Sequence, residues 1–490
     1  MMAFLVFSTT TRPLAHSFGR LPRQSAIIML RLLRTPLRPA PFATSTVVRA
    51  DLLTRRFATV RDISPKLNIQ QRDSKLQLSG ESLPQPLTLP YAWLRDSCQC
   101  PQCVHPTTKQ KLARTGDFLS STPNSVTIQN DNVRIQWGGR AEQHGAHDST
   151  YSLSFLKRYA EPTGHVRHTS HYDDILARQP WDLASFPTPA PHFIPYRSFK
   201  ADPLPGFIQV LKHGILLLRG VPHEWTERGT RARSAVEELA EEFGVIRETM
   251  YGRMWDVVSK KASTNIAFTN LKLDLHMDLM YLQNPPHIQF LHCIKNQVEG
   301  GRSVFVDGLK AAQDLWHQDR AAFQLLANTP IPFHYENDGH HLHRSHPTIE
   351  RAPNYDQHPS SSDVPPPIAE INYAPPFQAP LPITAPIKLY TALQQFTHLL
   401  ARPEARFEYL LHEGDCAVFD NRRVLHARTA FWDRNARQGE ANETNRWMKG
   451  CYVERDDLLN RTRGLLAKAI DGESINLVDR AKEIGVAVAI

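Results

Sequence analysis

Two stretches far apart in the chain decide the fold: Leu275-His276-Met277-Asp278, and residues 414–426, which read Gly-Asp-Cys-Ala-Val-Phe-Asp-Asn-Arg-Arg-Val-Leu-His. Residues i and i+2 of an extended strand point to the same face. His276 and Asp278 can therefore face one metal ion together, and a second strand has to bring His426 to it. Two imidazoles and one carboxylate on one side of an ion form the ligand set of a non-haem iron oxygenase.

An arginine downstream of this triad adds to the signal. Arg446 begins a predicted strand that runs to Val453. H-x-D is a short pattern, and a single histidine is usually a solvated or hydrogen-bonded residue. Arginine, however, pairs bidentately with a carboxylate in a dry pocket better than lysine does. The combination indicates an Fe(II) oxygenase that uses 2-oxoglutarate, with Arg446 on the carboxylate far from the metal.

Many short strands and few helices surround the triad. We expect helices at 227–242, 309–316, 319–328 and 387–401, and strands at 213–221, 287–294, 303–306, 406–411, 415–420 and 447–453. This pattern favours an α+β, mainly β, catalytic domain of the double-stranded β-helix (jelly-roll) type.

Three cysteines, Cys98, Cys100 and Cys103, form a C-x-C-x-x-C pattern. Closely spaced thiolates can converge on one zinc ion, which needs a fourth ligand. The candidates are His105, His144 and His147. His105 is very close to Cys103, and His147 follows a predicted strand at 132–137, so we favour His147. The alternative is three buried free cysteines. The pattern predicts a small N-terminal zinc-binding β domain at 65–160.

The positive charge is confined to one end of the chain. Residues 1–57 contain nine arginines, no lysine and one acid, which accounts for the whole formal charge of +8. The remainder is balanced, which argues against nucleic-acid binding, and no apolar run is long enough to span a membrane. An Arg- and Ser-rich leader of this kind is typical of a mitochondrial transit peptide and predicts a location in the matrix. The alternative is a disordered basic tail that is not a targeting signal.

Proline content divides the rest of the chain. Residues 161–206, Pro-rich from 177 onward, are expected to form a linker, and residues 207–470 the catalytic domain. Residues 345–367 are rich in Pro, Ser and Asp without periodicity, which predicts a surface insertion.

Residues 65–465 resemble a known family, the γ-butyrobetaine and trimethyllysine dioxygenases of the taurine-dioxygenase-like superfamily. The stretches that carry the resemblance are 93–103, 251–255, 267–278, 285–293, 300–308, 420–426 and 446–452. The resemblance implies iron at His276, Asp278 and His426, zinc at Cys98, Cys100, Cys103 and His147, and 2-oxoglutarate at Arg446. It also implies O₂ as co-substrate, ascorbate as reductant, and a homodimer formed through the zinc unit.

The resemblance further implies an aromatic cage for a quaternary ammonium at Tyr251, Trp255 and Tyr452, with Phe268 where similar proteins have tyrosine. A trimethylammonium group has no N–H to donate, so ring faces are its natural partners. Without the resemblance, ordinary core packing would be the preferred reading of these aromatics.

The substrate depends on a few positions. Asn265 matches the asparagine that meets the substrate carboxylate in similar γ-butyrobetaine dioxygenases, which predicts hydroxylation of γ-butyrobetaine to L-carnitine. Residues 247–249 and 450–460 look closer to the trimethyllysine enzymes, and Ala374 departs from a polar segment of the family. The alternatives are trimethyllysine, another small molecule, or a non-catalytic ligand-binding module.

Overall fold

The computed structural model describes residues 67–471, except 82, 84, 130, 139–146, 161–172, 187–192, 260–264, 353–362 and 434–444. The predicted leader at 1–57 and His144 therefore lie outside the described residues. Within these residues, no helix is both long enough and apolar enough to cross a membrane.

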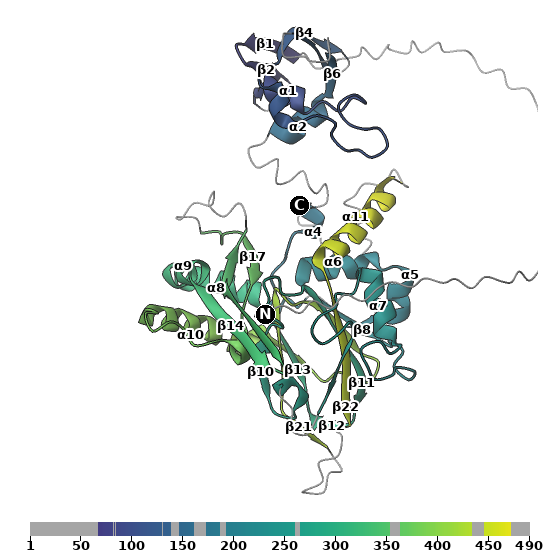
Figure 1. Cartoon of the computed structure of the whole chain (residues 1–490), viewed down its shortest axis with the longest axis vertical. Coiled ribbons are helices and arrows are strands. Elements are labelled where there is room, and N and C mark those ends of the chain that lie inside the picture. The colour runs from purple at the N-terminus through teal and green to yellow at the C-terminus, as the bar shows by residue number, and fades with distance from the viewer. Residues whose placement is uncertain are drawn as a thin grey trace, which may run out of the picture. The chain divides into compact units, whose positions relative to one another are not determined.

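The N-terminal part is mostly β, as expected (Figure 1). It contains two antiparallel three-stranded sheets and two short helices. Its elements are β1 (Leu67–Arg72), β2 (Lys75–Gly80), β3 (Leu87–Pro90), α1 (Tyr91–Asp96), β4 (Thr122–Gln129), β5 (Asn132–Gly138), β6 (His147–Ser152) and α2 (Leu153–Ala160). Strand β5 alternates strictly, with Val133, Ile135 and Trp137 fully buried. That period of two is what a strand with one solvated face requires.

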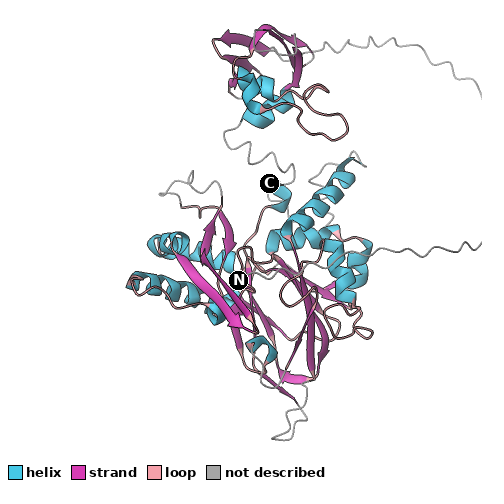
Figure 2. Cartoon of the chain, in the orientation of Figure 1, coloured by secondary structure: helices cyan, strands magenta, loops and turns pink. Residues whose placement is uncertain are grey.

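Two larger sheets form the centre of the C-terminal part (Figure 2). The six-stranded sheet consists, in order, of β7 (Ile194–Pro195), β8 (Ile215–Arg219), β19 (Cys416–Asp420), β11 (Ile288–Asn296), β22 (Arg446–Val453) and β9 (Trp255–Val258). The four-stranded sheet consists of β10 (Leu273–His276), β20 (Val424–Arg428), β13 (Ser303–Asp307) and β18 (Arg406–Tyr409). The mainly β fold is thus observed, and the double-stranded β-helix stays a prediction.

Strand β8 shows how the layers are built. Its residues 215–218 are all apolar and buried, because both faces of the strand are covered. Ile215 and Leu217 face the four-stranded sheet and share a cluster with Phe305 of β13. Leu216 and Leu218 face the other way. There they pack on helices α6 (Leu204–His213), α7 (Ala235–Phe243) and α11 (Arg455–Asp471).

A second group of helices packs on the other side of the triad strands. These are α8 (Gly308–Gln318), α9 (Arg320–Asn328) and α10 (Ile387–Ala401), close to their predicted bounds. They share a core cluster with the hairpin of β14 (Pro330–Asn337) and β15 (His340–Pro347). The remaining pairs are β12 (Val298–Gly300) with β21 (Phe431–Asp433), and β16 (Ile349–Arg351) with β17 (Ile368–Ile371).

One predicted helix starts later than expected. The helix placed at 227–242 begins only at Ala235. Gly229 has a φ of 120°, which no helix allows. The buried ammonium of Lys449 donates hydrogen bonds to the carbonyls of Glu227 (2.9 Å) and Gly229 (3.0 Å) and so stabilises a non-helical backbone there. The start of the segment therefore forms a loop that is held by Lys449.

Two predicted irregular segments carry ordered structure. The expected linker at 161–206 contains β7, α5 (Tyr196–Ala201) and the start of α6, and its Trp181 is buried. The first residues of the expected insertion at 345–367 belong to β15 and β16, while residues 353–362 lie outside the described residues.

A buried ion pair between Arg423 and Asp307 anchors the N-terminus of α8. Arg423 donates to both carboxylate oxygens of Asp307 (3.0 and 2.8 Å) and to the carbonyls of Lys212 and Gln179. Asp307 also caps α8 through the backbone N–H of Leu309. Both side chains are fully buried.

We therefore expect Asp307→Ala to lower the free energy of unfolding by about 3–5 kcal/mol, because it leaves the Arg423 charge buried without its partner. Urea unfolding followed by tryptophan fluorescence measures this. Arg302→Ala, at the exposed pair with Glu408, is the control and should cost at most about 1 kcal/mol. Equal losses in the two variants would contradict the role of the buried pair.

Candidate active site and metal centres

The predicted triad comes together in space. Strands β10 and β20 pair with His276 directly opposite His426, and the two ring centroids are 4.2 Å apart. Oδ1 of Asp278 lies 3.3 Å from Nε2 of His276 and 3.7 Å from Nε2 of His426. One ligand atom from each residue can thus bind a single ion. The donor set, two imidazole nitrogens and one carboxylate oxygen, fits non-haem iron.

Asp278 does not lie on the strand with His276, as the i, i+2 argument assumed. β10 ends at His276, and Asp278 lies in the turn that follows. Asn421 fixes this turn: its Oδ1 accepts from the backbone N–H of Asp278 (2.7 Å), and its Nδ2 donates to the carbonyls of Asp278 and Pro286 (both 3.0 Å). The buried amide of Asn421 therefore orients the Asp278 carboxylate, a task that the prediction had assigned to strand geometry.

Two further polar atoms of the triad, Oδ2 of Asp278 and Nδ1 of His276, already have hydrogen-bond partners, whereas the buried Nδ1 of His426 has none among the described residues. Oδ2 of Asp278 accepts from Nε2 of Gln289 and from the Tyr452 hydroxyl, both at 2.8 Å. Nδ1 of His276 lies 2.8 Å from the carbonyl of Asp274, which fixes the proton on Nδ1 and leaves Nε2 for a metal. Burial acts to raise the pKa of Asp278, but the imidazoles of His426 and His276 outweigh it and hold the pKa well below its usual range.

Arg446 lies in a cavity of about 550 Å³ that reaches the triad. The side chain is buried, and no acid among the described residues pairs with it. Burial lowers the pKa of Arg446 to about 10, so the guanidinium stays charged at neutral pH. A buried cation that lacks an anionic partner fits a ligand that brings a carboxylate.

A second buried arginine has a different task. Arg428 lines the same cavity, but it donates to three backbone carbonyls, those of Ala267 (3.0 Å), Thr269 (2.8 Å) and Leu271 (2.7 Å). It therefore holds residues 267–271 as a wall of the site. Arg446, unlike Arg428, makes no such contacts and is the arginine left for a ligand.

An aromatic cavity of about 530 Å³ adjoins the first one, and both are lined by Trp255, His276 and Asp278. All the predicted substrate-binding residues line it: the cage residues Tyr251, Trp255, Phe268 and Tyr452, and also Asn265. Two rings that the sequence did not single out join them, Tyr281 and Phe377, with centroids 5.4 Å apart.

A glycine makes room for the indole of the cage. Gly450 of β22 lies opposite Trp255 of β9 in the register. A Cβ at position 450 would lie 2.2 Å from the ring of Trp255, a distance that no side chain tolerates. Trp255 is thereby seated 5.4 Å from Tyr452, centroid to centroid.

Asn265 has polar partners within the cavity wall. Its Oδ1 accepts from the backbone N–H of Ala267 (2.9 Å), and its Nδ2 donates to the hydroxyl of Tyr251 (3.1 Å).

Ala374 is buried and does not line the cavity, whereas Phe377 from the same segment does. The segment that departs from the family pattern thus contributes a ring to the pocket.

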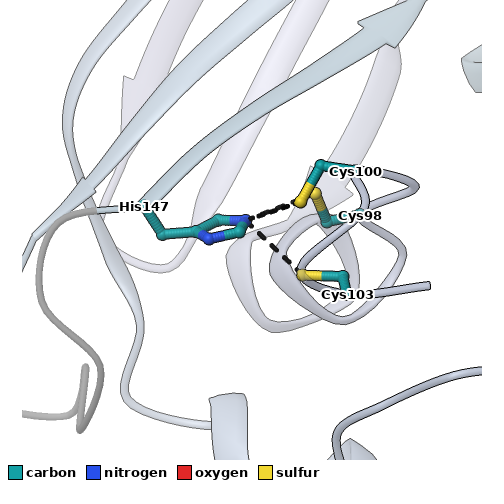
Figure 3. A group of neighbouring side chains, drawn as sticks. All are labelled: Cys98, Cys100, Cys103 and His147. Atoms are coloured by element: carbon teal, nitrogen blue, oxygen red, sulfur yellow. Dashed lines mark hydrogen bonds between the residues drawn. The ribbon is translucent and has the colours of Figure 1, made fainter. Parts of the chain in front are cut away.

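The N-terminal cysteine cluster also converges (Figure 3). Nε2 of His147 lies 3.4 Å from the sulfur of Cys98, 3.7 Å from that of Cys100 and 3.5 Å from that of Cys103. Four such donors at these separations could hold a tetrahedral zinc ion. Of the two candidate histidines that the structure describes, His147 joins the thiols, whereas His105 accepts from the backbone N–H groups of Thr107 and Thr108.

Two family models match the chain. Residues 195–452 match the family described as taurine catabolism dioxygenase TauD, TfdA family, and residues 67–157 match the one described as gamma-butyrobetaine hydroxylase-like, N-terminal. The chain belongs to the TauD/TfdA dioxygenase family. It is a 2-oxoglutarate-dependent dioxygenase, so the predicted enzyme class is confirmed and the non-catalytic alternative is set aside.

The relatives agree with the predicted resemblance. Dioxygenase str8 of Strobilurus tenacellus is 42% identical over 383 residues, which is 77% of this chain and 85% of that protein. Mitochondrial trimethyllysine dioxygenase of Bos taurus is 30% identical over 76% of this chain and 82% of its own length. Gamma-butyrobetaine dioxygenase of a Pseudomonas species is 31% identical over 75% and 88%. The identities with the trimethyllysine and γ-butyrobetaine enzymes, 30% and 31%, are too similar to indicate which of the two substrates this chain uses.

Tyr452→Phe should weaken iron binding roughly 10- to 100-fold, because it removes a hydrogen bond that holds Oδ2 of Asp278. Anaerobic titration of the metal-free chain with Fe(II) measures the affinity. Tyr281→Phe is the matched control: its hydroxyl lies 3.3 Å from the hydroxyl of Tyr251, so that variant should bind iron normally. Unchanged affinity in Tyr452→Phe would contradict the prediction.

His147→Ala should remove zinc from the N-terminal unit, because three thiols remain where a closed site needs four ligands. Elemental analysis of the purified chain should show one zinc fewer per chain than in the unaltered protein. His105→Ala changes a nearby histidine outside the cluster and should keep the metal. Full zinc in both variants would leave His147 without a ligand role.

Proposed function

We propose that this dioxygenase hydroxylates γ-butyrobetaine to L-carnitine, with Fe(II) on His276, Asp278 and His426. The observation that carries the proposal is the aromatic cavity that shares His276 and Asp278 with the cavity of Arg446. A substrate in the aromatic cavity lies beside the candidate metal, and a co-substrate can reach the metal from the other side.

The cavity suits a quaternary ammonium for a chemical reason. Its walls contain the rings of Tyr251, Trp255, Phe268, Tyr281, Phe377 and Tyr452, and ring faces attract a cation that cannot donate hydrogen bonds. Asp278, the one carboxylate among the described lining residues, already accepts two hydrogen bonds on Oδ2. Recognition of the cation therefore falls to the rings.

Each protein group has a positioning task. Bound iron with 2-oxoglutarate supplies the chemistry that consumes O₂, releases succinate and CO₂ and delivers a hydroxyl group to the substrate. Arg446 would hold the distal carboxylate of 2-oxoglutarate. Arg428 holds residues 267–271 in place through their carbonyls, and Ala267 of this segment lines both cavities. The amide of Asn265 accommodates a substrate carboxylate, which an acid at this position would repel. The protein supplies geometry and excludes water.

A second candidate is an uncharged or aromatic small molecule. Among the described residues that line the aromatic cavity there is no lysine or arginine, and the Asn265 amide is the group there that suits a substrate carboxylate. The 42% identity with dioxygenase str8 exceeds the identity with either carnitine-type enzyme. Trimethyllysine is the third candidate.

The remaining parts of the proposal follow the family. We infer a mitochondrial matrix location, supported by the mitochondrial trimethyllysine dioxygenases among the relatives. Structural zinc at Cys98, Cys100, Cys103 and His147 is supported by the convergent thiols. Ascorbate as reductant and a homodimer through this zinc unit are proposed on the resemblance alone.

Purified full-length protein, supplied with Fe(II), 2-oxoglutarate, O₂ and one candidate substrate at a time, tests the function. With γ-butyrobetaine we expect succinate and carnitine in equal amounts, measured by mass spectrometry. Hydroxylation of trimethyllysine alone would show that Asn265 does not select the substrate. Succinate without either product would favour the second candidate.

Trp255→Ala separates the cage from the rest of the enzyme. It removes a ring face from the cation, so we expect KM for γ-butyrobetaine to rise at least about 10-fold, with KM for 2-oxoglutarate little changed. Trp432→Ala alters an exposed tryptophan that lines neither cavity and serves as the control. An unchanged KM in Trp255→Ala would argue for a substrate without a cation.

A further inference from the structure

The outer face of the β14–β15 hairpin gathers three histidines and a glutamate. In the antiparallel register His334 lies opposite His343, and Glu336 lies opposite His341. Positions 334 and 336 share one face of β14, and 341 and 343 share the same face of β15, because side chains alternate along a strand. The four side chains therefore form a two-by-two group on one face.

These side chains point toward solvent, where a metal can reach them. The exposed fractions are 42% for His334, 57% for Glu336 and 73% for His341, and His343 is also exposed. The opposite face of the same hairpin carries Phe333 and Tyr335, which are buried in the core. The fold thus uses the inner face of the hairpin for packing and leaves the outer face to polar chemistry.

Glu336 already lies near two of the histidines, although the four ligand atoms have not converged on one point. Oε1 of Glu336 lies 3.2 Å from Nε2 of His341 and 4.0 Å from Nδ1 of His334. Ligand atoms around a tetrahedral zinc ion are about 3.4 Å apart, given metal–ligand bonds of about 2.0–2.2 Å. The ring of His343 has its centroid 6.1 Å from that of His341. Directly opposed residues have Cβ atoms about 4.5–5.5 Å apart, so rotation of these exposed side chains can close the set.

From this geometry we propose that His334, Glu336, His341 and His343 form a divalent metal site, separate from the iron triad and from the cysteine cluster. Three imidazoles with one carboxylate suit Zn²⁺ and its neighbours in the transition series, whereas Ca²⁺ and Mg²⁺ prefer oxygen ligands. The site binds a metal ion directly from solution, without a change in the backbone.

Zinc binding to the full chain, measured by equilibrium dialysis and elemental analysis, tests the site. The double variant His341→Ala/His343→Ala should bind one Zn²⁺ fewer per chain than the unaltered protein, since all other sites are common to both. His340→Ala is the matched control, because His340 lies opposite Asn337 on the other face; it should retain full binding. Equal binding in all three proteins, or an equal loss in the control, would overturn the proposal.

A second measurement needs no substitution and so does not depend on how a variant folds. Diethyl pyrocarbonate modifies accessible imidazoles, and peptide mass spectrometry locates each modified histidine. Added Zn²⁺ should protect His334, His341 and His343 in the unaltered chain while His340 continues to react. Modification of these three histidines at the same rate with and without Zn²⁺ would contradict the site.

Discussion

The antiparallel pairing of β10 with β20 is the constraint on which the active site depends. It places His276 opposite His426, and β13 pairs with the other edge of β20, so that Phe305 lies opposite His426. A one-residue slip of β20 would turn His426 to the other face of the sheet. Phe419 of the six-stranded sheet packs on His426, with ring centroids 5.0 Å apart, and this contact would be lost in such a slip. The packing between the sheets therefore supports the ligand geometry.

Much of this site could be predicted because the signals are local. The short apolar runs in 303–306 and 415–420, the cysteine spacing at 98–103 and the H-x-D pattern each depend on residues close in sequence. Gln289, Asn421, Tyr281 and Phe377 were not assigned roles, because their contacts join elements far apart in the chain. Asn421 lies inside the stretch 414–426, so an amide in the same stretch as the candidate ligand His426 was the available signal.

The errors have a common physical origin. The late start of α7 and the placement of Asp278 beyond β10 both come from a buried polar side chain that binds backbone groups: Lys449 for the carbonyls of 227 and 229, and Asn421 for the turn. Such contacts override helix or strand propensity because unpaired buried polar groups are costly. Periodicity in a single sequence carries no information about a partner two hundred residues away.

Tyr452 has two roles, and the ring that serves the first also carries the hydroxyl that serves the second. Its ring is a wall of the aromatic cavity, and its hydroxyl holds the carboxylate of the metal triad. Any change of side chain here that reshapes the cavity also disturbs the metal. Phe377 and Phe268 line the same cavity without a hydrogen bond to the triad carboxylate. Diversification of substrate scope, in evolution or in the laboratory, is therefore freest at the phenylalanines and most restricted at this tyrosine.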